Sequence, residues 1–176
     1  MNAGRIIIVG LLMSALVAGA VMYYLQVYGF YEEISAEVAE VQLTSLVTGE
    51  PEEILFENFK AIDSDSSPVR YRACFDTAMS LATLTETYEI YDEAVPLVAP
   101  VWLDCFDAAS IGTDLEVGTA IAFLGQENVQ YGIDRIVAVY DDGRAFAWHQ
   151  INACGEVVFD GNPVPEGCPT PPESLN

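Results

Sequence analysis

The stretch IDRIVAVYDDGRAFAWHQI, residues 133–151, decides the fold of most of this 176-residue chain. It consists of two β-rich runs, residues 133–140 and 144–151, separated by Asp141-Asp142-Gly143. An Asp-Gly pair between two such runs is typical of a tight hairpin turn, because glycine accepts the positive φ that the turn requires. The stretch therefore predicts an antiparallel hairpin at the centre of a sheet.

Shorter patterns on both sides of the hairpin extend this sheet. Alternating, β-branched and aromatic residues predict further strands at residues 41–47, 53–62, 69–75 and 156–159. Residues 79–91 are ambiguous: residues 80–86 fit the start of a helix, whereas the Thr- and Tyr-rich end favours extended chain. A helix capped by Asp107 or Ser110 is predicted to end at about residue 117. Residues 120–124 fit either state. The predicted fold class is α+β, a small, mainly antiparallel-sheet domain with one or two short helices.

An uncharged stretch, IIIVGLLMSALVAGAVMYYLQVYGFY, precedes this domain at residues 6–31. As a helix rising ~1.5 Å per residue it exceeds the ~30 Å hydrocarbon core of a bilayer. Its aromatic end suits the lipid–water boundary, and Arg5 before it favours a cytoplasmic N-terminus. We therefore expect a cytoplasmic segment at residues 1–5, a transmembrane helix at 6–31, an acidic periplasmic domain at 32–168 and a Pro-rich flexible tail at 169–176.

A cleaved signal peptide is the alternative for this stretch, because Ala18-Gly19-Ala20 has the small-x-small form of a cleavage site. The apolar run continues to Tyr31, which favours a retained anchor in the bacterial inner membrane. Small residues also recur along the predicted span, at Gly10, Ser14, Ala18, Ala15 and Gly19. Such a stripe allows another membrane helix to approach closely, although glycine and alanine are common in spans in general.

The charge of the chain is distributed unevenly. Of 27 acidic and six basic residues, only Arg5 precedes the end of the apolar stretch, so the remainder holds 27 acids and five bases, a net charge of −22. Nucleic-acid binding is excluded as a function class, because phosphates require clusters of Lys and Arg. Such a domain attracts metal cations or a basic protein. The alternative is that its acidity serves only solubility.

Four cysteines, Cys74, Cys105, Cys154 and Cys168, all follow the apolar stretch. An even number in an oxidising compartment indicates two disulfides. Three pairings are possible, and we favour Cys74–Cys105 with Cys154–Cys168, because the second pair closes a short loop rich in Gly and Pro. A zinc site is disfavoured, since no C-x-x-C pair occurs.

The remaining chemistry-bearing residues predict no catalytic site, cofactor site or metal site. His149 is the single histidine and has no partner motif, so we interpret it as structural. Asp63-x-Asp65-x-Ser67 begins like a calcium loop, but Pro68 and Cys74 replace the required Gly and Glu. Asp141-Asp142 is interpreted first as a turn. The scarce bases Arg70, Arg72, Arg135 and Arg144 are expected to pair with carboxylates.

Four segments together resemble a family of uncharacterised single-span proteins: YGIDRIVAVYDDGRAFAWHQINACGE (131–156), DSDSSPVRYRACF (63–75), SLATLTETY (80–88) and DCFDAASIG (104–112). The family is known from Alphaproteobacteria of the Rhodobacter–Paracoccus group, where members are sometimes labelled histidine kinases. The chain gives that label no support, because it lacks nucleotide-binding Gly-rich boxes. The resemblance implies a periplasm-facing protein in bacteria with an elaborate respiratory or photosynthetic membrane.

These observations lead to two functional hypotheses. The first is a non-catalytic accessory subunit of an inner-membrane complex of respiratory electron transport, whose acidic domain covers a partner surface or steers a basic carrier such as cytochrome c. The second is an independent periplasmic binding or envelope-maintenance module, with calcium as a candidate ligand. An enzyme is disfavoured, because no nucleophile–base spacing is visible.

Overall fold

The computed structural model describes residues 3–173. Along the chain these residues divide into two compact units, with the boundary between Tyr31 and Glu32. The first unit is the helix α1 (Ala3–Tyr24), continued by the π-helical turn η1 (Leu25–Gly29). A long apolar run without proline suits a helix, which satisfies its own backbone groups. The predicted N-terminal helix is confirmed, although helical backbone occupies residues 3–29 rather than 6–31.

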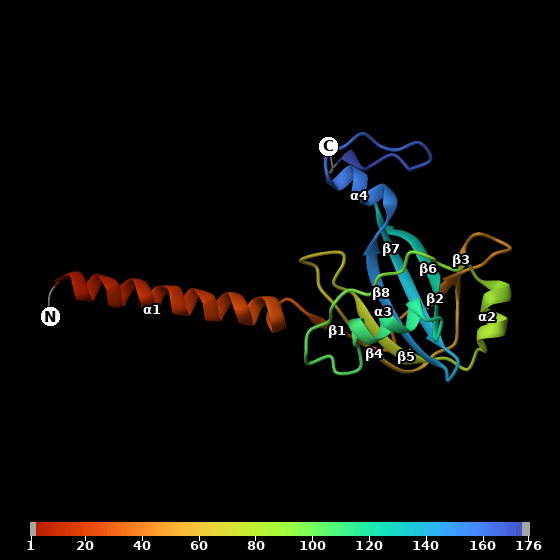
Figure 1. The fold of residues 1–176 in the computed structure, drawn as a ribbon, viewed down its shortest axis with the longest axis horizontal. Coiled ribbons are helices and arrows are strands. Elements are labelled where there is room, and N and C mark those ends of the chain that lie inside the picture. The colour runs from red at the N-terminus through yellow and green to blue at the C-terminus, as the bar shows by residue number, and fades with distance from the viewer. Residues whose placement is uncertain (1–2, 174–176) are drawn as a thin grey trace. The chain divides into compact units, whose positions relative to one another are not determined.

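The second unit is built on a six-stranded, wholly antiparallel sheet (Figure 1). Its order is β1-β4-β5-β8-β7-β6. The strands are β1 (Glu32–Ile34), β4 (Glu57–Asp63), β5 (Arg72–Asp76), β6 (Ala120–Gln130), β7 (Ile133–Tyr140) and β8 (Arg144–Ile151). The central hairpin β7–β8 has the predicted bounds, and Gly143 has a φ of +89° in its turn. The predicted antiparallel α+β fold is thus confirmed.

A second, two-stranded sheet pairs β2 (Gln42–Thr44) with β3 (Pro51–Glu53). Main-chain bonds of Glu89 join the two sheets: its N–H donates to the Thr44 carbonyl at 2.9 Å, and its carbonyl accepts from the Leu124 N–H at 2.9 Å. The chain around Glu89 therefore lies between β2 and the edge strand β6. This arrangement covers part of an edge that would otherwise be unpaired.

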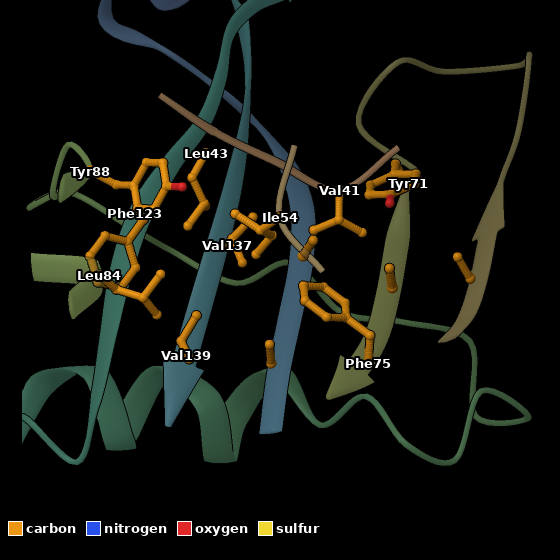
Figure 2. Close-up of a cluster of buried hydrophobic side chains, with 14 residues drawn as sticks. Val41, Leu43, Ile54, Tyr71, Phe75, Leu84, Tyr88, Phe123, Val137 and Val139 are labelled. Atoms are coloured by element: carbon orange, nitrogen blue, oxygen red, sulfur yellow. The ribbon is translucent and has the colours of Figure 1, made fainter. Parts of the chain in front are cut away.

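One face of the large sheet carries the main hydrophobic core (Figure 2). Alternate residues of β7, including Val137 and Val139, point to this face and are fully buried. Opposite them lie Leu43 of β2 and Leu84 of the helix α2 (Leu81–Thr87). The N-terminus of α2 is capped by Ser80, whose side chain accepts from the Thr83 N–H.

The other face of the sheet is covered by the chain from Pro96 to Phe106 and by the helix α3 (Ala108–Glu116). Phe106 makes edge contacts with Phe146 and Trp148 of β8. Asp107 caps α3, as predicted, by accepting from two backbone N–H groups. The sheet is therefore buried on both faces, which explains why most of β7 and β8 is apolar at consecutive positions.

Several predicted elements differ in extent, and one differs in kind. The strands predicted at 41–47, 53–62 and 69–75 are present in shorter or shifted form as β2, β4 and β5, and residues 120–124 begin the strand β6. The strand predicted at 156–159 is wrong, because residues there belong to the helix α4 (Ala153–Phe159). Asn152 caps this helix by accepting from the Gly155 N–H at 2.9 Å, and this local bond overrides the β preference of the valines. As far as residue 173, the second unit thus has three short α-helices rather than one or two.

Candidate functional site

Both predicted disulfides are present, with the favoured pairing. Cys74–Cys105 ties β5 to the segment that covers the sheet, and Cys154–Cys168 closes the loop after α4. The Cα atoms lie 6.3 Å and 5.7 Å apart, within the usual range for a disulfide. The cysteines are therefore structural in this unit.

His149 lies on the core face of β8 and has both ring nitrogens engaged. Its Nδ1 is 2.7 Å from the Pro68 carbonyl oxygen, and its Nε2 accepts from Arg135 Nε at 3.1 Å. The ring stacks on Tyr71 at 4.7 Å between centroids. Burial, followed by the positive charge of Arg135, lowers the pKa of His149 to about 4. The imidazole is thus neutral, with its proton on Nδ1, and serves as a structural link.

Arg72 has a comparable structural role on the opposite face. Its buried guanidinium donates to the carbonyls of Val69, Tyr71, Leu97 and Val98, at 2.6–3.2 Å. It thereby fastens the covering segment to β5. Arg144, in contrast, pairs with Asp142 at 2.8 Å on the surface, as predicted for this base and for the turn.

Asp134 is a buried carboxylate that the sequence patterns did not single out. Its Oδ1 accepts from the Asn128 N–H at 2.9 Å and from Asn152 Nδ2 at 2.7 Å, and its Oδ2 accepts from the Tyr91 hydroxyl at 3.4 Å. Burial, and then the charge of Asp134, raises the pKa of Tyr91 to about 12. A carboxylate within a strand that is otherwise mostly apolar, with Arg135 as its single other charged residue, was the available clue. Asp134 thus fixes Tyr91 and, through Asn152, the start of α4.

An apolar groove opens on one side of Tyr91, between the segment 90–96, the end of α3 and the start of β6. It has a volume of about 390 Å³. Its floor and walls include the small residues Gly112, Gly118, Ala120 and Ala122, which leave the space unfilled. The other lining residues are Ile90, Tyr91, Asp92, Ala94, Val95, Pro96, Leu115, Glu116 and Ile121. We call this feature the apolar groove.

Two further hollows, which share Tyr91 with the groove as a lining residue, are rich in carboxylates. They measure about 320 Å³ and 570 Å³. Six acidic residues line these hollows: Glu50, Glu89, Asp92, Glu93, Glu127 and Asp134. No Lys, Arg or His among residues 3–173 lines either hollow or the apolar groove. We call the two together the acidic hollows.

The family of the chain follows from its second unit. Residues 41–169 match DUF6446, a family of unknown function. The chain belongs to this family. Comparisons with curated proteins and with solved structures each found no match. Since the match omits α1, we call residues 41–169 the DUF6446 domain.

The loop Asp63-x-Asp65-x-Ser67 of the DUF6446 domain, which only begins like a calcium loop, is closed by its own hydrogen bonds. Asp63 Oδ1 accepts from the Ser64 N–H at 2.8 Å, and the Ser64 and Ser66 hydroxyls are 2.7 Å apart. Within the described residues, no three or more His, Cys, Asp or Glu side chains are grouped so that they could hold a metal ion. Asp63 is partly buried, and desolvation raises its pKa.

Outside the DUF6446 domain, α1 and η1 form one apolar helix, Ala3–Gly29, with mean hydropathy 2.4 in its most apolar window. It is long and apolar enough to cross a membrane, a property that leader sequences share. The predicted packing residues Gly10, Ser14, Ala15, Ala18 and Gly19 lie on this exposed helix, where the Ser14 hydroxyl donates to the Leu11 carbonyl at 3.0 Å. Helix packing at this stripe stays a prediction. In the predicted tail, Pro169 accepts a hydrogen bond from the Tyr131 hydroxyl, and residues 1–2 and 174–176 lie outside the described range.

Proposed function

We propose that the chain is a non-catalytic accessory subunit of an inner-membrane electron-transport complex. One helix anchors it, and its acidic DUF6446 domain, in the periplasm, covers a partner surface or guides a basic carrier such as cytochrome c. The observation that carries this proposal is an apolar helix with every side chain exposed, attached to a disulfide-bonded acidic domain. The resemblance noted in the sequence favours a respiratory complex over other membrane assemblies.

The exposed helix supports anchoring. Leu11, Leu12 and Leu16 are each about two-thirds exposed, and such a surface is unfavourable in water. A bilayer removes this cost, and a second helix packed on the small-residue stripe would add close van der Waals contact.

The two disulfides support a periplasmic location for the domain. Disulfides persist in oxidising compartments and are rare in the cytosol. Arg5, before the helix, favours the same orientation through the preference of basic residues for the cytoplasmic side. The DUF6446 domain holds 22 acids and five bases, and its net charge of −17 keeps it away from anionic lipid headgroups and leaves it accessible to a cationic partner.

The engagement of the buried polar groups supports a non-catalytic role. His149, Asp134 and Arg72 are held by fixed hydrogen bonds inside the domain. A general base must reach a substrate proton, whereas both nitrogens of His149 already have protein partners.

Co-purification tests the proposal. The tagged full-length chain is extracted in mild detergent, and bound chains are identified by mass spectrometry. We expect subunits of one electron-transport complex in a fixed ratio. The triple variant Gly10→Leu, Ser14→Leu, Ala18→Leu fills the stripe and should lose them.

A matched control changes the opposite side of the same helix. The variant Val9→Leu, Leu12→Ile, Leu16→Ile keeps the helix equally apolar and should retain the complex. Recovery of the wild-type chain alone, or equal recovery of the complex with both variants, would contradict packing through the stripe, and the first result would also remove the accessory role.

A further inference from the structure

We propose that the apolar groove of the DUF6446 domain receives an apolar side chain of a partner protein, presented in a segment that carries Lys or Arg on either side of it. This inference rests on the proposed function, in which the acidic domain binds a partner protein. It adds the chemistry by which the domain would recognise that partner.

The apolar half of this chemistry comes from the groove itself. Ile90 is 47% exposed and Val95 60% exposed on its rim, while the small residues on its floor leave space. Grooves of about 300 Å³ or more that are lined by apolar groups are typical binding sites. Covering Ile90 and Val95 with an apolar side chain removes their surface from water, which stabilises the bound state.

The groove is preformed, because its outer wall is fixed on two sides. The Tyr91 N–H donates to the Ala122 carbonyl at 2.9 Å, which attaches the segment to β6. Gln150 attaches it to β8: its Oε1 accepts from the Val95 N–H at 2.7 Å, and its Nε2 donates to the Glu93 carbonyl at 2.8 Å. A wall held in this way loses little conformational freedom on binding.

The charge around the groove selects a cationic occupant. Asp92 and Glu116 line the groove and are exposed, and the acidic hollows, one of which shares Ile90, Tyr91 and Asp92 with the groove, continue the negative surface. With no basic side chain among the described lining residues, the potential there is negative. A Lys or Arg beside the inserted side chain therefore lies against carboxylates, which steers association and fixes the register.

Other occupants are disfavoured by the same charge. A second copy of this chain would bring one DUF6446 domain of net charge −17 (22 acids and five bases in residues 41–169) against another of the same charge, and like charges placed together cost binding energy. Anionic lipid headgroups are repelled for the same reason. The occupant that we propose for the groove is thus a basic segment of a different protein.

Peptide selection tests this inference even while the natural partner is unidentified. A displayed library of random peptides, about 12 residues long, is selected on the full-length chain in nanodiscs of zwitterionic lipid. Parallel selection uses the variant Asp92→Asn, Glu116→Gln, Val95→Ser. We expect the wild-type chain alone to enrich peptides with one large aliphatic residue between Lys or Arg residues.

One enriched peptide is then measured by fluorescence anisotropy against single variants. Ile90→Ser and Val95→Ser should each weaken binding roughly five- to tenfold, and raising NaCl from about 50 mM to about 500 mM should weaken it roughly tenfold or more. Leu55→Ser and Glu57→Gln, at exposed positions outside the groove, serve as matched controls and should leave binding unchanged. Equal thermal midpoints show that the variants are folded.

Three results would overturn the inference. They are enrichment of peptides without basic residues, equal enrichment on the triple variant, and concentration-dependent self-association that Val95→Ser abolishes. The failures of the two proposals are distinguishable: loss of co-purifying subunits removes the accessory role, whereas absence of groove-dependent peptides removes only this recognition mode.

Discussion

His149 shows, at the scale of the residue, how a titratable side chain is made structural. It is 6% exposed and joins three parts of the DUF6446 domain: β8, β7 through Arg135, and the loop at Pro68. Protonation of Nε2 would remove the acceptor for Arg135 and place two positive charges 3.1 Å apart. The geometry therefore holds the imidazole neutral in the folded state.

The first prediction is a pH-dependent stability that depends on His149. Its pKa is about 4 when folded, against 6.5 ordinarily, so below pH 6.5 the unfolded chain binds a proton that the folded chain does not. Stability is therefore present above pH 6.5 and decreases toward pH 4. Between about pH 7 and pH 5 we expect a loss of about 2 kcal/mol from this residue, measured by urea unfolding.

The control for this prediction is His149→Gln, compared with the wild-type chain at the same two pH values. His149 is the single histidine, so the variant should be less stable at pH 7 but lose less on acidification. Asp63 acts in the opposite sense, because its raised pKa makes the folded state gain stability as pH decreases toward 4. For this reason the comparison ends at pH 5. An identical slope in wild type and variant would contradict the role of His149.

At the scale of the element, the hairpin β7–β8 was predictable at its correct bounds and α4 was not. Both strands of the hairpin are continuous β-rich runs, and Gly143 supplies the turn conformation locally. The helix α4 has a local cap at Asn152, but its position also depends on a contact distant in sequence: Gly155 packs against Gly132, where a Cβ on either residue would meet the backbone of the other. No local pattern reveals such a pair.

The candidate site was predictable in part, for a similar reason. The disulfide pairing followed from compartment and loop length, and the acidic character followed from composition. The apolar groove did not, because Ile90, Val95 and Ala122 come from distant segments, and only the fold brings them together. The hydrogen bonds of Arg72 to four backbone carbonyls were not predictable, because only the fold brings the carbonyls of Leu97 and Val98 against β5.

The second prediction concerns the Cys154–Cys168 bridge. The helix α4 lies beyond the ends of β7 and β8 (Figure 1), and its links to the sheet are the Asn152 cap and the Gly132–Gly155 contact. The double variant Cys154→Ser, Cys168→Ser should destabilise this part by roughly 3 kcal/mol, the chain-entropy value for such a loop. Hydrogen exchange should increase across residues 153–168 and remain unchanged in β7 and β8.

The matched variant for this prediction removes the other bridge. Cys74 is buried in β5 beneath the covering segment, so Cys74→Ser with Cys105→Ser should lower the thermal midpoint of the whole domain. If both double variants accelerated exchange to the same extent throughout the sheet, α4 would belong to the cooperative core, and its assignment as a separate local unit would be wrong.

At the scale of the whole molecule, the chain separates apolar surface from charge. The helix Ala3–Gly29 contains Arg5 as its single charged residue, and all acids follow it. This separation gives each unit a different solvent, lipid for the helix and water for the DUF6446 domain. The helix can anchor the DUF6446 domain to the membrane only if it remains attached after export.

The third prediction is that the helix is retained. Signal peptides have an apolar region of roughly 7–15 residues that ends before the cleavage site, whereas here α1 continues through Ala18-Gly19-Ala20 without a break to Tyr24. Intact-mass measurement of the protein extracted from membranes should therefore include residues 6–31. As a control, residues 32–176 exported behind an unrelated cleavable leader should be recovered in the soluble periplasmic fraction with both disulfides formed. A mature chain that begins near residue 21 would mean that the apolar stretch only directs export, and the membrane-anchored accessory role would then have no physical basis.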